Sequence, residues 1–293
     1  MRILAIIVTY NRLDLLKECI IALSNQSYKN FDFLVIDNAS TDGTLSYLKE
    51  SNVPFVHMDH NAGGAGGFSR GLKEGVERGY DYVWAMDDDT IPDEDCLLNL
   101  VDSIEKLNSD FGFVCSYVKW INDEPCVMNI PSPASLSSAK TVFFAKTGVL
   151  SCKSASFVSI LFPARIIKKY GLPIKEFFIW GDDIEYTKRI SRYENCFCNY
   201  NSSVVHKMKN NNPTDIVSDI PERLNRYKFS FRNRCFIARQ DGFKGIISNN
   251  LSVVYQIIKI IRYKNKKKLL KIFIVLSGWF KGQFFRPRIE YVD

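Results

Sequence analysis

The stretch Tyr80-Asp-Tyr-Val-Trp-Ala-Met86, followed at once by Asp87-Asp88-Asp89, decides the fold. Its nearly continuous apolar run is typical of a strand that is buried on both faces of a parallel sheet. Three adjacent carboxylates repel one another and need a cation or solvent nearby. Ligands bind beyond the carboxyl ends of the strands in such sheets, so the triplet predicts the functional edge. A solvated acidic turn is the alternative.

The sequence on both sides of this strand alternates strand and helix signals. It predicts strands over residues 2–9, 31–36, 53–58, 111–119, 156–162 and around 204–206, and helices over 12–25, 44–50, 68–78, 92–108 and 164–170. Repeated β-α-β units imply an α/β fold with a mostly parallel sheet flanked by helices. Residues 120–154 are rich in Pro and Ser and are expected to form an irregular segment near a bound substrate. From Pro221 onward the pattern is helical, which predicts a catalytic domain over 1–215 and a helical region over 216–293.

The net charge of +7 belongs to one segment of the chain. Residues 259–288 hold ten Lys or Arg and no acid, whereas residues 1–258 hold 29 basic and 30 acidic residues. The eight cysteines show no spacing typical of zinc sites, which favours structural thiols in a reducing cytosol. The N-terminal apolar run is too short for a signal peptide, and we find no membrane-spanning stretch.

A glycine-rich segment, Asn61-Ala-Gly-Gly-Ala-Gly-Gly-Phe-Ser-Arg-Gly71, precedes the third predicted helix. We expect a loop here, in which glycines let the backbone approach a ligand and the following helix offers free N–H groups. The spacing matches neither a P-loop nor a dinucleotide-binding fingerprint. Arg70 suits a phosphate or base contact. A flexible turn is the alternative.

Two further polar clusters complete the candidate site. Asp37, in Asp-Asn-Ala-Ser-Thr-Asp-Gly43, is placed to accept the N3–H of uracil or thymine, although the segment also fits an Asx-turn before a helix. The stretch from Phe177 to Tyr186 contains Asp182 and Asp183 among aromatic residues. Apolar surroundings raise a carboxylate pKa toward that of a useful general base, and acidic residues also favour a helix N-terminus. His206 alone is more often structural than a ligand.

Together these segments resemble glycosyltransferase family 2, an inverting family with the Rossmann-like GT-A fold. Within it, the Gly-Gly-Ala-Gly-Gly-Phe run, the triple Asp and the Trp-Gly-Asp-Asp-Ile-Glu stretch resemble the galactofuranosyltransferase branch. The resemblance covers about residues 1–210 and is carried by residues 8–12, 35–44, 61–71, 87–89 and 180–185. Trp180 departs from the pattern, because Gly181 separates it from the acidic pair, and the assignment of the base can shift by one residue.

The resemblance implies roles for individual residues and for their ligands. Asp87, Asp89 and His206 would hold Mn²⁺ or Mg²⁺, Asp183 would be the catalytic base with Asp182 beside it, and Trp180 and Glu185 would bind the acceptor. A UDP-sugar donor would lie against Thr9, Tyr10, Arg12, Asp37, Asn61, Gly63, Gly64, Arg70, Asp87 and Asp88.

The implied reaction is transfer of galactofuranose from UDP-galactofuranose to a lipid-linked saccharide in bacterial O-antigen or capsule biosynthesis. Alternatives are a rhamnosyltransferase that uses dTDP-rhamnose and a sugar-nucleotide binder without activity. The basic, amphipathic tail predicts peripheral attachment to the cytoplasmic face of the membrane, or a helix packed on the catalytic domain. Few aromatic residues in the basic segment are placed for stacking, which argues against nucleic acid. The sequence leaves a homo-oligomer open.

Overall fold

The computed structural model describes residues 1–134 and 146–292, so part of the segment predicted near the acceptor lies outside the described residues. A ten-stranded sheet crosses this part of the chain. Its order is β3 (Phe55–His57), β2 (Asp32–Asp37), β1 (Ile3–Thr9), β4 (Tyr82–Asp87), β9 (Ile160–Pro163), β6 (Val114–Lys119), β10 (Phe197–His206), β8 (Val149–Ser154) and β7 (Ser132–Pro133). Strand β5 (Thr90–Pro92) pairs with β10 off this path.

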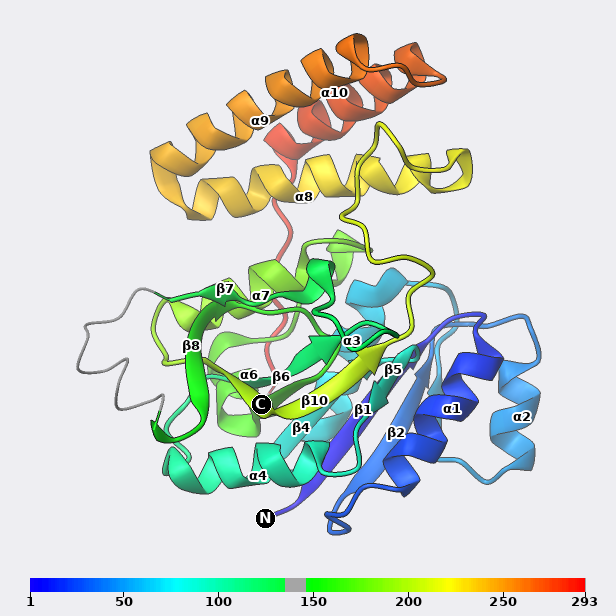
Figure 1. Ribbon diagram of the computed structural model, residues 1–293, viewed down its shortest axis with the longest axis vertical. Coiled ribbons are helices and arrows are strands. Elements are labelled where there is room, and N and C mark those ends of the chain that lie inside the picture. Colours follow the sequence, from blue (N-terminus) through cyan, green and yellow to red (C-terminus); the bar gives the residue numbers. More distant parts are fainter. Residues whose placement is uncertain (135–145, 293) are drawn as a thin grey trace.

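The direction of the strands confirms the predicted mostly parallel sheet. Strand β1 is parallel to β2 and β4, β2 is parallel to β3, and β6 is parallel to β10. Strand β9 is antiparallel to both β4 and β6, so β6 and β10 point the same way as β1. In Figure 1, β1 rises from the N-terminus toward the end of the molecule that carries the C-terminal helices. The carboxyl ends of these strands therefore face that helical layer.

Helices cover both faces of the sheet, and further helices form a layer of their own. The former are α1 (Leu13–Ser24), α2 (Thr44–Glu50), α3 (Gly63–Glu77), α4 (Cys96–Lys106), α6 (Ala164–Tyr170) and α7 (Asp182–Ser191). The layer consists of α8 (Tyr227–Gln240), α9 (Gly242–Arg262) and α10 (Lys268–Phe284), preceded by the 3-10 turn η3 (Pro221–Arg226), and lies beyond the sheet in Figure 1. Within the described ranges 1–134 and 146–292, none of the helices has the length and apolar character needed to cross a bilayer.

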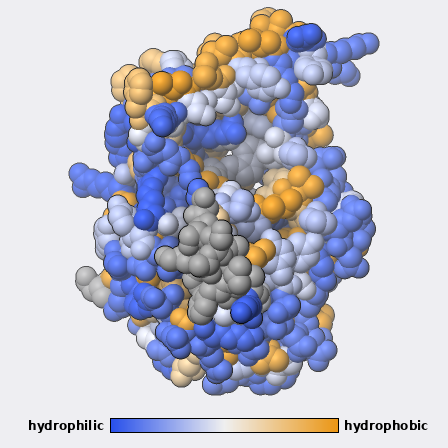
Figure 2. Space-filling model, turned by 60° about the vertical axis from the view of Figure 1, so that its left-hand side comes forward, coloured by the Kyte–Doolittle hydropathy of each residue, from blue (hydrophilic) through white to orange (hydrophobic). Residues whose placement is uncertain are grey.

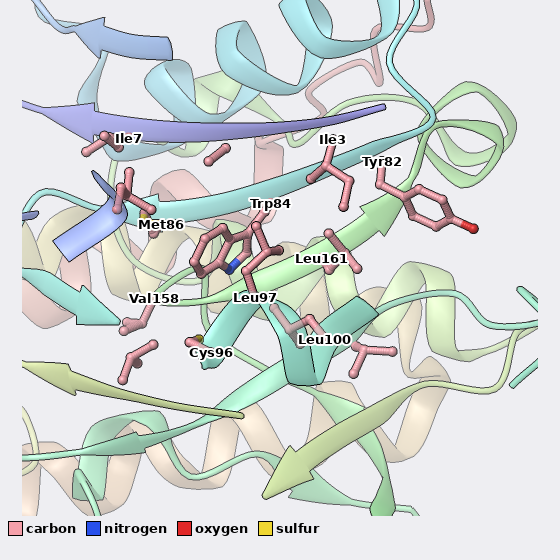
Figure 3. Packing of buried hydrophobic residues seen from close by; sticks show 14 of the residues in the cluster. Ile3, Ile7, Tyr82, Trp84, Met86, Cys96, Leu97, Leu100, Val158 and Leu161 are labelled. Carbon is pink, nitrogen blue, oxygen red and sulfur yellow. The ribbon is translucent and has the colours of Figure 1, made fainter. Parts of the chain in front are cut away.

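Two apolar cores hold the sheet between its helices. Trp84 of β4 is fully buried in one of them, where its indole nitrogen donates to Ser159 Oγ at 2.9 Å. Figure 3 shows Trp84 among Leu97 and Leu100 of α4 and Leu161 of β9. Because the strand is buried on both faces, it places the three aspartates that follow it firmly at the edge of the sheet.

The expected glycine-rich loop is wrong, because the glycines lie in α3, which begins at Gly63 rather than Phe68. Gly67, Gly71 and Gly75 are four residues apart and face the sheet. A Cβ atom on them would lie 2.4 Å from Val8, 2.4 Å from Ile6 and 2.3 Å from Val83. The glycines therefore let α3 lie close against the strands, a packing requirement that outweighs their low helix propensity.

We expect Gly75→Ala to destabilise the protein. The new methyl would meet Val83 Cγ2 at 2.3 Å, and a β-branched side chain has little freedom to move away. Overpacking typically lowers the free energy of unfolding by about 1 to 3 kcal/mol, whereas the better helix propensity of alanine raises it by about 1 kcal/mol. Urea unfolding of the variant and the wild type would measure the net change in this free energy. Gly64→Ala is the matched control, since its Cβ meets nothing within 4 Å; an equal or higher stability for Gly75→Ala would contradict the packing argument.

Candidate active site

Three side chains predicted as metal ligands converge at the edge of the sheet. Strand β5 follows the acidic triplet and pairs with β10, which sets Thr90 opposite His206. The pairing brings His206 Nε2 to 3.1 Å from Asp89 Oδ1. Ligand atoms of Asp87, Asp89 and His206 all lie within 4.8 Å of one another. Two carboxylates and an imidazole are a donor set that suits Mn²⁺ and related divalent cations.

The protonation of this cluster reflects its concentrated negative charge. Burial and the neighbouring Asp89 raise the pKa of Asp87 to about 8. Burial also opposes ionisation of Asp89, but His206 and Arg12 hold its pKa below the usual value. Burial would lower the pKa of His206, yet the hydrogen bond to Asp89 and the nearby carboxylates raise it to about 10. Protons therefore balance the charge here, and a bound divalent cation would replace them.

A partner of His206 that the sequence did not predict is Asn129, in the 3-10 turn η1 (Val127–Asn129). Asn129 Nδ2 donates to Ser156 Oγ at 2.8 Å, so its Oδ1 faces His206 Nδ1 at 2.9 Å. The amide oxygen accepts the proton of Nδ1, which leaves Nε2 directed at Asp89 as the ligand nitrogen. No motif marks Asn129, which lies 77 residues before its partner.

Asn129→Leu is expected to weaken Mn²⁺ binding by about 10- to 100-fold, the usual effect of losing an outer partner of a histidine ligand. Calorimetric titration with Mn²⁺ in the absence of nucleotide would measure it. Asn211→Ala is a suitable control. Asn211 Oδ1 accepts from the backbone N–H of Val127, in the turn that holds Asn129, at 2.8 Å, but Asn211 is not a partner of His206. Unchanged affinity in Asn129→Leu would show that the tautomer of His206 is set by another group.

The middle aspartate of the triplet contacts the end of β1. Thr9 Oγ1 donates to Asp88 Oδ2 at 2.8 Å, and Arg12 donates to Asp88 at 3.2 Å and to Asp89 at 2.5 Å. Tyr10 is exposed between them. The predicted donor-binding residues of β1 thus lie beside the triplet, with the Arg12 guanidinium offsetting its charge.

Asp37 lies at the neighbouring end of β2 and is fully buried. Its Oδ1 accepts from Ser40 N at 3.0 Å, and its Oδ2 lies 2.7 Å from His57 Nδ1. His57 was not predicted as part of the site. The next residue, Asn38, accepts from Ala62 N at 2.9 Å and donates to Gly63 O at 2.9 Å. These contacts join the end of β2 to the start of α3.

The remaining predicted donor residues lie on the first turns of α3. Asn61 precedes the helix, and its Oδ1 accepts from the backbone N–H of Gly63, the first residue of α3, at 2.8 Å. A Cβ on Gly64 would enter open space. Arg70 lies farther along α3 and pairs with Glu74 at 2.6 Å while its side chain stays about half exposed. Arg70 is therefore accessible, with its present charge partner on its own helix.

The second acidic cluster is at the N-terminus of α7. Gly181, with φ +92°, precedes the helix, and Asp183 Oδ1 accepts from Ile184 N at 2.7 Å. Burial raises the pKa of the partly exposed Asp183 to about 6, although backbone N–H groups act in the opposite direction. Burial and Asp183 raise the pKa of Asp182 well above its usual value, and the charge of Asp87 contributes to the rise. The acidic pair therefore lies close enough to the triplet for Asp87 to act on Asp182.

The two predicted acceptor-binding residues differ in their surroundings. Trp180 packs edge-on against Tyr227 at 4.9 Å between centroids. It lines a cavity of about 260 Å³ between the start of α7 and α8, together with Gly181, Ile184, Ser230, Arg234 and Ile237. The prediction for Glu185 does not fit the structure. Glu185 is fully buried, pairs with Arg189 at 2.7 Å and accepts from Gln240 at 3.0 Å, so its carboxylate is used within the protein.

Comparison with known sequences gives two related findings. A model of the family described as "Glycosyl transferase family 2" matches residues 4–159. The galactofuranosyltransferase GlfT1 of Mycolicibacterium smegmatis is 25% identical over 264 residues, which cover 83% of this chain and 85% of that protein.

Solved structures share the fold at low sequence identity. Staphylococcus aureus TarS 1–349 in complex with UDP has a TM-score of 0.56 and 14% identity, covering 97% of this chain and 72% of that one. The mannosyltransferase PcManGT of Pyrobaculum calidifontis, solved with GDP-Man and Mn²⁺, has a TM-score of 0.56 and 16% identity, covering 94% and 73%. These similarities confirm the predicted GT-A fold.

Proposed function

The chain belongs to glycosyl transferase family 2 and is a hexosyltransferase, and on this premise we propose that it transfers galactofuranose from UDP-galactofuranose to a lipid-linked saccharide with inversion. The observation that carries the proposal is the convergence of Asp87, Asp89 and His206 in one cluster, with Asp182 close enough for the charge of Asp87 to raise its pKa. Similarity to GlfT1 over most of both chains supports galactofuranose as the sugar.

Asp87, Asp89 and His206 would hold the divalent cation, which when bound stabilises the negative charge that develops on a departing diphosphate. Thr9 donates to Asp88 and Arg12 to Asp89, so these bonds fix the aspartates of the triplet. Asp37, beside His57 at the end of β2, would accept the N3–H of uracil. The bonds from Asn38 to Ala62 and Gly63 would then keep the start of α3 against the nucleotide.

Asp183 would act as the general base. The residue is partly exposed, as contact with an acceptor hydroxyl requires, and its raised pKa places it within the range of an effective base. As Asp183 takes the hydroxyl proton, the acceptor oxygen bonds to the anomeric carbon from the face opposite the diphosphate. The bond between that carbon and the diphosphate oxygen breaks, and UDP leaves. Trp180, at the mouth of the neighbouring cavity, would orient the acceptor.

The outer faces of α9 and α10 support attachment to a membrane surface. Their inner faces meet α8 around Phe231, Val253, Ile260 and Ile274, which are all buried. These helices expose large apolar side chains, namely Leu251, Ile258, Ile261, Leu269, Phe273, Phe280 and Phe284. Figure 2 shows hydrophobic surface gathered along the helical end of the molecule. Exposed lysines between the two helices flank these side chains at positions 264, 266 and 267. Such a surface fits the headgroup region of an anionic bilayer and would bring a lipid-linked acceptor to the site.

Phe273→Glu is expected to reduce cosedimentation with vesicles that contain anionic phosphatidylglycerol. The Phe273 side chain is 61% exposed on α10, and a carboxylate there opposes both insertion and the negative surface. Ile21→Glu is the control, since Ile21 is equally exposed, at 61%, but lies on α1. Equal binding of both variants would remove this surface from the proposal.

A donor assay tests the proposed reaction. The enzyme with Mn²⁺ is incubated with a lipid-linked saccharide and either UDP-galactofuranose or dTDP-rhamnose, and the released nucleotide is measured. Release of UDP with transfer of galactofuranose is the expected result. Release of dTDP alone would favour a rhamnosyltransferase, and no transfer from either sugar donor would contradict the assignment.

A further inference from the structure

One face of α8 contacts the segment immediately before the acidic pair. Phe229 stacks on Phe178 at 4.8 Å between centroids, and Phe236 packs edge-on against Phe177 at 5.6 Å. Between them, Arg232 donates to Phe177 O at 3.2 Å. The contacting residues on α8 follow the spacing of a single helical face: Phe229, Arg232, Asn233 and Phe236.

The contacted segment has a backbone that side-chain-bearing residues rarely adopt. Phe178 has φ +63° and ψ −60°, and Ile179 N donates to Phe177 O at 2.7 Å. This is a γ-turn of the uncommon, strained form. Two residues later, Trp180 has φ +65°. Such conformations persist only where the surrounding structure holds them, and they concentrate at functional sites.

Asn233 provides the polar contacts that hold this turn. It is fully buried, and its Nδ2 lies 3.0 Å from Phe177 O, 3.2 Å from Ile179 O and 2.9 Å from Trp180 O. Arg232 Nε donates to Asn233 Oδ1 at 3.0 Å. The amide oxygen is thereby turned toward the guanidinium, and the amide nitrogen faces the three carbonyl groups. An amide nitrogen is a donor only and carries two N–H groups, so in this orientation it shares two donors among the three carbonyl groups.

The opposite side of the turn contacts the start of α3. Phe178 O accepts from Ala65 N at 3.2 Å, and a Cβ on Gly63 would lie 1.9 Å from the same oxygen. The turn is therefore enclosed between α3, which carries the predicted donor-binding glycines, and α8 of the C-terminal layer. Its downstream end is Gly181, where α7 begins with the acidic pair.

We propose that Asn233 is a positioning residue, which fixes the strained turn at Phe177–Trp180 and so sets the positions of Asp183 and Trp180. The C-terminal helices would thus complete the active site in addition to any contact with a membrane. This inference rests on the proposed role of Asp183 as the base. Displacing a catalytic group by about 1 Å typically lowers the rate about 100-fold, so loss of the turn's restraints is expected to reduce kcat by about 10- to 100-fold.

Asn233→Asp and Asn233→Ala test the proposal in the full chain. Aspartate keeps the shape of the side chain but cannot donate to the carbonyl groups, so it is expected to lower kcat at least as much as alanine. UDP binding in the presence of Mn²⁺, measured by calorimetry, is expected to stay within about twofold of the wild type, because the turn is not among the proposed nucleotide contacts. Asn249→Ala is the matched control, since Asn249 is another asparagine of the C-terminal helices but joins α9 to α8, through Cys235 Sγ at 3.5 Å, and among the described residues has no bond to the turn.

The possible outcomes separate positioning from general stability. A kcat within about twofold of wild type in Asn233→Asp would overturn the proposal. Parallel losses of kcat, UDP affinity and melting temperature in both variants would also overturn it, since they indicate a general structural role. If Asp183→Asn keeps full activity while the Asn233 variants lose it, the assignment of the base fails instead.

Discussion

Asp183→Asn is expected to lower kcat by about 10²- to 10⁴-fold, the usual contribution of a general base. The amide keeps the volume of the carboxyl group and its place at the N-terminus of α7, but it cannot accept the acceptor's proton. The KM for the donor is expected to change little, because the predicted donor contacts come from β1, β2, β4 and α3. Initial rates over a range of donor concentrations measure both constants.

The pH dependence of kcat provides a separate test of the same residue. The base must be ionised, and burial raises the pKa of Asp183 to about 6. The carboxyl group is protonated below that pH, so kcat is expected to rise with pH through about 6 and then level off. In Asp183→Asn this rise is expected to disappear from the residual activity.

Asp241→Asn is the control for Asp183→Asn. Asp241 pairs with Lys188 at 2.5 Å and Arg192 at 3.1 Å, at the other end of α7. Its loss perturbs the same helix without removing a carboxylate from the site. A similar fall in kcat for both variants would indicate that α7 needs its charge pairs more than it needs a base at position 183.

Asp89→Asn is expected to reduce Mn²⁺ affinity and transfer activity by more than about 100-fold, since outer partners of metal ligands alone contribute 10- to 100-fold. Asp89 contacts both His206 and Arg12, so the substitution removes a ligand, leaves His206 without this carboxylate and leaves Arg12 paired with Asp88 alone. Titration with Mn²⁺ by calorimetry measures affinity independently of turnover. Excess Mn²⁺ is expected to restore only part of the activity.

Asp93→Asn is the control for the triplet. Asp93 comes directly after β5, four residues beyond Asp89. It pairs with Lys119 at 2.8 Å and is not part of the metal cluster. It is expected to retain both Mn²⁺ binding and transfer. An Asp89→Asn variant with wild-type affinity would show that the cation is held elsewhere, and the proposed role of the triplet would then be wrong.

The sequence predicted most elements of the sheet and several helices closely. The helices α2 and α6 begin and end where the periodicity placed them, because both have clear boundary signals and local amphipathic patterns. The short strand β5 was missed, since three residues are too few to show a period. The start of α3 was misplaced, because a run of glycines is locally typical of a loop. In the folded protein the same glycines allow a helix to pack closely on Val8, Ile6 and Val83.

Some site residues could be predicted from local sequence, whereas others depend on contacts between distant segments. Asp87 and Asp89 follow an apolar strand, and that local pattern is visible in the sequence. The contacts of Asn129 with His206 and of Asn233 with the turn before α7 join residues more than 50 positions apart. Neither asparagine stands in a motif. The family resemblance assigned Glu185 to the acceptor, but helix geometry turns its side chain inward to Arg189.

The mostly parallel sheet and its acidic edge follow from the sequence itself, because hydrophobic periodicity and the rules for β-α-β crossovers act over short stretches of chain. Tertiary structure alone decided which side chains support the reactive ones. The choice of His206 tautomer, the burial of Glu185 and the restraint of the strained turn depend on contacts between distant segments. Such contacts form only when the sheet and the C-terminal helices have packed together, so no local pattern in the chain records them.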